Sequence, residues 1–348
     1  MKDYKDFYKK ICKGFIIAEI GKNYNGDIEI AKEMIKVAAG CGVDAVKFQS
    51  IRAEKLVIKD MDKVAHLEDT LDKKESVFDM IKKVELTRED HFTLAEVAKN
   101  EGVEFFSTPE DLEVIDILED VDVNFYKIAS LDLTFLQLIE KVANKGKPII
   151  ISTGMGTLSE IYDAIDLVYK CGNKNIILLH CVSSYPPPIH DHNLNAIPYL
   201  QSVFNVPIGY SDHSTGITIP IAATALGAVV IEKHFTLDKS MPGPDHRISV
   251  NPEELKQMVK SINEVRMALG HSRKVPVSSE LSMRENIRRK MVASKNLSKG
   301  SVIKRNMIEY KSSSIGLDPK YLDVLLGRVL AIEMNQDDVF SWNHISPK

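Results

Sequence analysis

The sequence predicts a (β/α)8 TIM barrel followed by a small β-rich domain. The chain has 348 residues, 44% of them hydrophobic, which is enough for a core of about 200 residues and a smaller second unit. Up to residue 272, short apolar segments typical of strands alternate with amphipathic segments typical of helices. This alternation indicates a parallel sheet, and eight repeats of it fit a closed barrel.

Eight segments are predicted to be strands because they are short, apolar and end in polar residues. In chain order they are FIIAEIG from Phe15, DAVKFQ from Asp44, EFFSTP from Glu104, FYKIAS from Phe125, PIIIST from Pro148, NIILLHC from Asn175, PIGYSD from Pro207 and VVIEKHF from Val229. The segments between most of them predict helices. For example, DIEIAKEMIKVAAGCG places Ala31, Met34 and Ile35 on one face, and TREDHFTLAEVAKNEG begins with Thr87 as a predicted N-cap.

An open, doubly wound sheet is the alternative architecture. Such sheets often carry a GxGxxG turn after the first strand, but this chain has GKNYNG there. The segment between the second and third strands is longer than an ordinary crossover. We expect an extended loop and a helix in it, and long loops on barrels are often functional.

The pattern changes after Arg273, which predicts a barrel domain over residues 1–272, a Ser-rich linker over 273–287 and a small domain over 288–348. The last domain combines short apolar segments with turn signals at Lys299-Gly300, Gly316 and Asp318-Pro319. One short helix is predicted there, near residues 319–326.

Composition and charge exclude several classes of function. The formal net charge is −4 and no block of Lys and Arg occurs, so we expect no nucleic-acid or membrane-surface partner. No apolar run approaches the roughly 20 residues of a membrane helix. The charged N-terminus lacks the apolar core of a signal peptide, and the four cysteines show no CxxC spacing. We therefore expect a cytoplasmic protein with free thiols.

All eight predicted strands end in polar or charged residues, and in barrels of this kind the catalytic groups lie at these ends. In the last strand, Glu232 and His234 are two residues apart and point to the same side. One or two polar strand ends would be unremarkable, but eight predict one convergent site. The other ends carry Glu19, Lys47 with Gln49, Ser107 with Thr108, Lys127 with Ser130, Ser152 with Thr153, His180 with Ser183, and Ser211 with Asp212 and His213.

The residue types at these ends indicate two kinds of chemistry. The lysines and hydroxyls suit a phosphate ester, which is bound by charge-assisted and small hydrogen-bond donors. His213 and His234, together with a carboxylate such as Glu19, suit a divalent transition metal with open coordination positions. A lone buried histidine is usually a core residue. Two histidines on neighbouring strand ends, beside Asp212 and Glu232, favour a metal site.

At these residues the chain resembles the sialic acid synthase family, which includes N-acetylneuraminate, legionaminate and pseudaminate synthases. The resemblance covers nearly the whole chain, and the part from about Arg288 resembles the family's antifreeze-like (SAF, β-clip) domain. It rests on the motifs IIAEIGKNYNGD, DAVKFQ, STP, YKIAS, IISTGM, LLHCVSSYPPP, GYSDHSTG and IEKHFTLDKSMPGPDH. Together these motifs are specific, although none of them is specific alone.

The resemblance implies a phosphoenolpyruvate-dependent, C–C bond-forming transferase. Phosphoenolpyruvate would condense with the aldehyde of an N-acylated hexosamine to give a nine-carbon 2-keto acid and phosphate. The implied cofactor is a divalent metal, Mn²⁺ first, with Mg²⁺ or Co²⁺ as alternatives, held by His213 and His234. The implied phosphoenolpyruvate site contains Lys47, Gln49, Thr108, Lys127, Ser130, Ser152, Ser183 and Ser211. The implied catalytic and sugar contacts are Glu19, Asp132, Tyr185 and Asp245.

The chain departs from the family's pattern at three places. It has Asn23-Tyr24 where Asn-His is usual, Leu131 where a small residue is usual, and KSSSIG from Lys311 where KRPGxG is usual. In the family the arginine of that last motif reaches the sugar in the partner subunit, which implies a domain-swapped homodimer. Lys311 and Ser312 occupy this place here, and serine cannot make a bidentate contact. We therefore expect an altered acceptor sugar.

The sequence leaves two other functions open. One is a phosphoenolpyruvate–aldose synthase that makes an eight-carbon acid, against which the antifreeze-like tail and the GYSDH motif argue. The other is a non-catalytic sugar-binding or assembly homologue, which the three departures would suit. The sequence also leaves the acceptor open between N-acetylmannosamine and a 2,4-diacetamido-trideoxyhexose.

Overall fold

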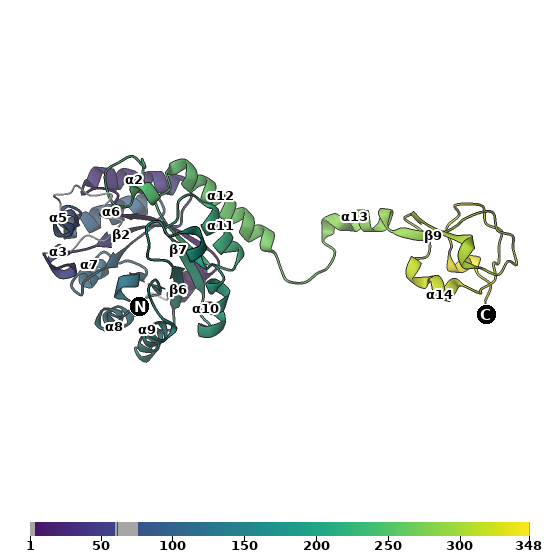
Figure 1. Cartoon of the computed structure of the whole chain (residues 1–348), viewed down its shortest axis with the longest axis horizontal. Helices are drawn as coiled ribbons and strands as arrows, with labels where there is room; N and C mark the ends of the chain where they lie inside the picture. Colours follow the sequence, from purple (N-terminus) through teal and green to yellow (C-terminus); the bar gives the residue numbers. More distant parts are fainter. Residues whose placement is uncertain (1–3, 60, 62–75, 348) are drawn as a thin grey trace. The chain divides into compact units, whose positions relative to one another are not determined.

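The computed structural model describes residues 4–59, 61 and 76–347 of the chain. These residues form two compact units, which divide at Gly270 (Figure 1). The predicted loop between the second and third strands includes residue 60 and residues 62–75, which lie outside the described part.

The first unit is built on an eight-stranded parallel sheet in the order β3-β2-β1-β8-β7-β6-β5-β4. The first and last strands pair directly, from Phe15 opposite Val230 to Glu19 opposite His234. The strands are β1 (Phe15–Gly21), β2 (Ala45–Ser50), β3 (Glu104–Pro109), β4 (Tyr126–Ile128), β5 (Ile149–Ser152), β6 (Ile176–Cys181), β7 (Ile208–Asp212) and β8 (Val230–His234). All eight predicted strands are confirmed.

Side chains close the sheet between β3 and β4. The rings of Phe106 and Phe125 lie 4.1 Å apart between centroids, and the Asn124 amide donates to Glu104 Oε2 at 2.8 Å. The strands thus follow one another around a ring, with no reversal of strand order as in a doubly wound sheet. The predicted barrel is confirmed and the open alternative is excluded.

Helices surround the sheet and pack on its outward-facing side chains (Figure 1). The long ones begin at defined caps: Asp27 accepts from two backbone N–H groups of α2, and Thr87 forms a capping box with Asp90 at the start of α6. The helices of this unit are α1 (Lys5–Cys12), α2 (Ile28–Gly40), α3 (Ala53–Leu56), α5 (Val77–Lys83), α6 (Arg88–Asn100), α7 (Val114–Asp120), α8 (Leu136–Ala143), α9 (Leu158–Lys170), α10 (Ala196–Phe204), α11 (Thr218–Ala225) and α12 (Pro252–Leu269).

The inward-facing residues of the strands form layers inside the barrel. Near the N-terminal ends of the strands the layer is apolar and includes Phe15, Phe106 and Phe125, on which Ile11 of α1 packs. Since side chains alternate between the two faces of a strand, the residues two positions further along also point inward. In β1 that residue is Ile17, which still belongs to the apolar layer, and the next one is Glu19, so a polar layer lies above an apolar floor.

The second unit contains one short antiparallel pair and several irregular segments around its own core. β9 (Arg289–Ala293) pairs with β10 (Ile308–Ser312), and isolated bridges join further segments. The predicted helix is present as a 3₁₀ turn over Pro319–Tyr321 followed by α14 (Leu322–Leu325). The segment expected as a linker contains α13 (Ser278–Ile287), a helix without buried side chains. None of the described helices is long and apolar enough to cross a membrane.

Candidate active site

A cavity of about 480 Å³ lies at the C-terminal ends of the barrel strands, where catalytic groups of such barrels are found. Its walls come from every part of the strand ring. Twelve of the residues predicted for the site line it: Glu19, Lys47, Gln49, Thr108, Lys127, Ser130, Ser152, Ser183, Tyr185, Ser211, His213 and His234.

Because side chains alternate between the two faces of a strand, some of the predicted strand-end residues point outward and do not line this cavity. The expectation that Ser107 belongs to the site is wrong, because its hydroxyl faces outward and lies 2.6 Å from that of Ser50. Asp212 is also turned away and pairs with Lys233 at 2.6 Å, with both side chains fully buried. In the segment Glu232-Lys233-His234, therefore, the lysine stabilises the outer wall of the barrel, while the glutamate and the histidine point into it.

Two lysines and two glutamates form a buried charged group at the bottom of the cavity. Lys47 Nζ lies 2.7 Å from Glu19 Oε2 and 3.9 Å from Glu232 Oε2. Lys127 Nζ lies 3.0 Å from Glu232 Oε1. Because buried charges are costly unless paired, each lysine stabilises the carboxylate beside it.

The two glutamates differ in acidity. Burial raises the pKa of Glu232, but Lys127 and Lys47 outweigh it and bring that pKa down to about 2. For Glu19, burial raises the pKa by more than Lys47 lowers it, so the net direction is upward. Glu232 is thus a fixed anion that anchors the lysines, while Glu19 is the carboxyl that can more readily take up a proton.

Hydroxyl groups surround the two lysines. Thr108 Oγ1 accepts from Lys47 at 3.0 Å, and Ser211 Oγ donates to Glu232 at 3.0 Å. Ser130 Oγ accepts the backbone N–H of Gly154 at 3.1 Å. Ser152 Oγ is buried and has no hydrogen-bond partner among the described residues. Two ammonium groups among several small hydroxyls form a cradle for an anion with several oxygens, such as a phosphate.

Gly154 is required for the shape of this cradle. A Cβ at this position would lie 2.4 Å from Ser183 Oγ and 2.7 Å from Ser130 Oγ. The absence of a side chain lets the backbone of the loop after β5 approach both hydroxyls.

The two predicted metal histidines lie together at the ends of β7 and β8, two residues beyond Ser211 and Glu232. Their ring centroids are 5.5 Å apart, and Tyr185 packs on His213 at 4.1 Å. His213 Nδ1 is 2.8 Å from the carbonyl oxygen of Val182, and His234 Nδ1 is buried without a hydrogen-bond partner. Burial lowers the pKa of both rings, that of His234 to about 3, so both are neutral at pH 7. Neutral imidazole is the form that binds metal ions.

The expected third ligand is not in place for such a site. Glu19 is paired with Lys47, and no group of three or more His, Cys, Asp or Glu side chains in the described part of the chain could hold a metal ion. The residues present still fit a metal with open positions, because a buried imidazole nitrogen lacks a partner and a second imidazole faces it. The other ligands would then be substrate or water oxygens.

A second cavity of about 370 Å³ adjoins the first one and shares Gln49, Met61, Glu110, Leu131, Tyr185 and His234 with it. The predicted Asp245 lines this second cavity, where its Oδ2 lies 3.9 Å from Lys22 Nζ. The remaining wall is apolar and comes from the segment after β2: Ile51, Leu56, Val57, Val77, Met80 and Ile81. Gln49 donates to Glu19 Oε1 at 3.1 Å and so connects the two spaces.

Asp132 lies in a 3₁₀ turn directly after β4, over Ser130–Asp132. It lines neither cavity, but it is buried and its Oδ2 has no hydrogen-bond partner among the described residues. Burial raises the pKa of this carboxyl to about 7.

The three departures from the family pattern fall in different places. Tyr24 is buried, donates to the carbonyl oxygen of Val84 and lines neither cavity, so it belongs to the core. Leu131 is 52% exposed and lines both cavities. Lys311 and Ser312 lie exposed on β10 of the second unit, where Lys311 pairs with Asp337.

Sequence reasoning gave no role to two acidic residues of the site. It placed Glu232 on the same face of the strand as His234, but it did not predict that Glu232 pairs with Lys127 and lies near Lys47. Glu110 follows the STP motif and lines both cavities. Its position beyond a strand end was the only signal in the sequence.

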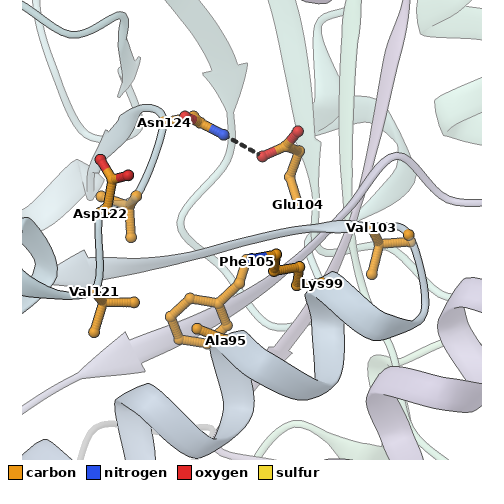
Figure 2. A pocket seen from close by; sticks show the side chains of 10 residues that line it. Ala95, Lys99, Val103, Glu104, Phe105, Val121, Asp122 and Asn124 are labelled. Atoms are coloured by element: carbon orange, nitrogen blue, oxygen red, sulfur yellow. Dashed lines mark hydrogen bonds between the residues drawn. The ribbon is translucent and has the colours of Figure 1, made fainter. Parts of the chain in front are cut away.

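Another cavity, of about 470 Å³, lies at the opposite ends of β3 and β4 (Figure 2). Its lining includes Ala95, Val103, Phe105 and Val121, and Glu104 accepts the hydrogen bond from Asn124 shown there. Because it lies at the N-terminal ends of the strands, where conserved features of barrels serve stability, we do not place the site there.

Comparison with known proteins identifies relatives of the whole chain. The chain is 40% identical to N,N'-diacetyllegionaminic acid synthase of Legionella pneumophila, over 95% of this chain and 94% of that protein. It is 36% identical to pseudaminic acid synthase of Helicobacter pylori, over 90% and 92% of the two chains. The crystal structure of N-acetylneuraminic acid synthetase from Leptospira borgpetersenii, in complex with citrate, matches with a TM-score of 0.71 at 38% identity, over 78% of this chain and 90% of that one.

Family models give the same result for both units. The NeuB family matches residues 34–274, and the SAF domain matches residues 288–346. The resemblance noted in the sequence is thereby confirmed. The chain belongs to the NeuB family and carries a SAF domain after its barrel.

Proposed function

We propose that the protein condenses phosphoenolpyruvate with the aldehyde of an N-acylated hexosamine, giving a nine-carbon 2-keto acid and phosphate. One observation carries this proposal: two lysines, several hydroxyls and two neutral imidazoles line the same buried cavity. The relatives are named as synthases of legionaminic, pseudaminic and sialic acids, which supports the product class.

In this proposal the phosphate of phosphoenolpyruvate binds among Lys47, Lys127 and the hydroxyls near them. Ser152 Oγ and the ammonium groups would donate to its oxygens. Glu232 keeps both lysines in place before the substrate arrives, since its pKa of about 2 leaves it ionised. Thr108, Ser130, Ser183, Ser211 and Gln49 complete the wall around the substrate.

His213 and His234 would hold a divalent metal, for which we propose Mn²⁺. When bound, the ion would polarise the aldehyde of the acceptor and help to orient the sugar. Because His234 lines both cavities, an acceptor whose aldehyde lies near the imidazoles extends into the second cavity, toward Asp245 and Tyr185.

The chemical step forms a bond between C3 of phosphoenolpyruvate and the aldehyde carbon. Positive charge then develops at C2, where the carboxylate of Glu19 can stabilise it or take a proton from the attacking water. Water adds to C2 to give a tetrahedral adduct, and the proton it releases balances the one taken up by the aldehyde oxygen, which becomes a hydroxyl. The bond between C2 and the phosphate oxygen then breaks, and phosphate leaves with the second proton, which yields the 2-keto group. Glu19 suits the proton transfer because burial raises its pKa above the usual value of a glutamate.

We also propose that the protein acts as a domain-swapped homodimer, in which Lys311 and Ser312 of one subunit approach the sugar site of its partner. Supporting this, both side chains are exposed in the second unit. Lys311 would supply a point charge in place of a bidentate arginine.

The first experiment measures phosphate release from phosphoenolpyruvate with Mn²⁺ present. The acceptor panel contains N-acetylmannosamine and 2,4-diacetamido-2,4,6-trideoxyhexoses. Release that depends on one acceptor establishes the synthase, and the product mass should correspond to a nine-carbon acid. No release with any acceptor, from folded protein that binds Mn²⁺, would favour the non-catalytic sugar-binding role.

A further inference from the structure

Glu110 lies where the two cavities meet and lines both of them. Its side chain is 7% exposed, and none of the hydrogen bonds or ion pairs among the described residues involves its carboxyl group. Its backbone is held, since the N–H donates to the carbonyl oxygen of Ser50 at 3.2 Å. The carboxyl is thus buried, attached to an anchored backbone and available to a ligand.

The wall of the second cavity is different in character. Ile51, Val77, Met80 and Ile81 form a separate hydrophobic cluster, on which Leu56 and Val57 pack. All six side chains line the cavity, and Lys22, Gln49 and Asp245 are polar groups of the same space. The second cavity therefore offers hydrogen-bonding groups and an extensive apolar wall to the same ligand.

A purely structural role does not account for Glu110. Burying a carboxyl without a partner costs free energy, and proteins normally avoid it unless a ligand supplies the missing hydrogen bond. Burial, together with the nearby carboxyl groups of Asp132 and Glu19, raises the pKa of this group to about 7. The ammonium groups of Lys22 and Lys47 act in the opposite direction but form no ion pair with it.

We propose that Glu110 is a specificity-determining residue that accepts a hydrogen bond from an amide N–H or hydroxyl of the acceptor sugar, while the apolar wall contacts the sugar's methyl groups. This inference rests on the proposed synthase function and concerns the same site. An acceptor with two acetamido groups and a deoxygenated terminal carbon carries three methyl groups, whereas N-acetylmannosamine carries one. The combination of Glu110 and the apolar wall therefore selects the 2,4-diacetamido-trideoxyhexose.

The test compares steady-state kinetics of the full-length Mn²⁺ enzyme with its Glu110→Gln and Glu110→Ala variants. Both acceptor classes are assayed, and KM is measured separately for acceptor and for phosphoenolpyruvate. The matched control is Glu96→Gln, an exposed glutamate on α6 without an ion pair among the described residues. Glu110→Gln keeps the size of the side chain, so it addresses the case in which Glu110→Ala fails to fold.

We expect kcat/KM for the diacetamido sugar to fall about ten- to hundredfold in Glu110→Ala, the usual effect of losing a hydrogen bond to a charged group. KM for phosphoenolpyruvate should stay within about twofold, because the lysine cradle is untouched. Val57→Thr, which makes the half-buried wall more polar at constant size, should narrow the preference for the diacetamido sugar over N-acetylmannosamine.

Two results would overturn the proposal. In the first, the Glu110 variants leave acceptor KM and the ratio between the two acceptors unchanged. In the second, they raise KM for both substrates equally, which indicates general damage to the site. If the unmodified protein releases no phosphate with either sugar, the synthase function itself fails and this assignment fails with it, an outcome recognisable before any variant is made.

Discussion

Asp132 shows how a single buried carboxyl group makes the free energy of unfolding depend on pH. A carboxyl with a pKa of about 7 in the folded chain has a pKa near 3.9 when the chain is unfolded. Between these values the unfolded state binds fewer protons than the folded state, so the free energy of unfolding falls as the pH rises from about 4 to about 7. Above pH 7 the folded protein must keep an ionised carboxylate buried.

Asp132→Asn should therefore stabilise the free protein at pH 8 but change its stability little at pH 4. The upper limit of the gain is about 4 kcal/mol, from about three pKa units at 1.36 kcal/mol each. Urea unfolding from pH 4 to pH 8 measures it, with Asp163→Asn on the exposed face of α9 as control. A stability difference that does not vary with pH would contradict the raised pKa.

His234→Ala should remove metal binding together with turnover. The imidazole is buried, neutral and without a partner at Nδ1, so its replacement deletes one of only two protein ligands proposed for the ion. We expect the affinity for Mn²⁺, measured by titration calorimetry in the absence of substrates, to fall by about tenfold or more.

The control for this variant is His190→Ala, because His190 is exposed on the loop after β6. Its affinity for Mn²⁺ should equal that of the unmodified protein. Unchanged affinity in His234→Ala would refute the ligand assignment, even if turnover were lost.

At the level of elements, the strand period determines which strand-end residues enter the cavity. The sequence predicted the strands and their polar ends, and with them most of the wall residues. It did not separate Ser107 from Thr108, or Asp212 from Ser211, because both members of each pair are polar and only the register of the strand decides which one faces inward. The pairing of Lys127 with Glu232 joins residues 105 positions apart, and no local pattern encodes it.

The apolar wall of the second cavity was also not predictable from the sequence. Its residues come from the short helices α3 and α5 and from Ile51 and Val57, which flank α3, and their patterns predict ordinary packing. They become a ligand wall only because the barrel brings the segment after β2 near the loops that carry Glu110 and Asp245. Long-range placement of this kind depends on the closed sheet as a whole.

Gly154→Ala tests the close approach of the loop after β5. The added methyl group would collide with Ser183 Oγ and Ser130 Oγ, so at least one hydroxyl must leave the cradle. We expect KM for phosphoenolpyruvate to rise about tenfold, with metal affinity unchanged.

Gly40→Ala is the matched control, because a Cβ at Gly40 meets nothing within 4 Å. At the end of α2 this change should be neutral or stabilise the protein by up to about 1 kcal/mol. If Gly154→Ala behaved like Gly40→Ala in both kinetics and stability, the loop would not contribute to the phosphate site.

At the scale of the whole molecule, the two units raise the question of what the second one does. The barrel unit already holds both cavities, the lysine cradle and the two imidazoles. A chain ending at Gly270 should therefore fold and bind Mn²⁺ and phosphoenolpyruvate, because α13 buries no side chains and its removal exposes no core. In a domain-swapped dimer it should nevertheless lose turnover, because the SAF domain of a partner would be missing from its sugar site.

Mixing this truncated chain with full-length His234→Ala protein makes the test sharper. Neither chain should release phosphate alone, since one lacks the SAF domain and the other lacks a metal ligand. In a swapped heterodimer the intact barrel of the truncated chain receives the SAF domain of the full-length chain, so activity should return in proportion to the heterodimer formed. On the same mixtures, phosphate release measures the activity and light scattering measures the heterodimer formed. Full activity of the truncated chain alone, or heterodimers without activity, would show that the second unit does not complete the partner's site.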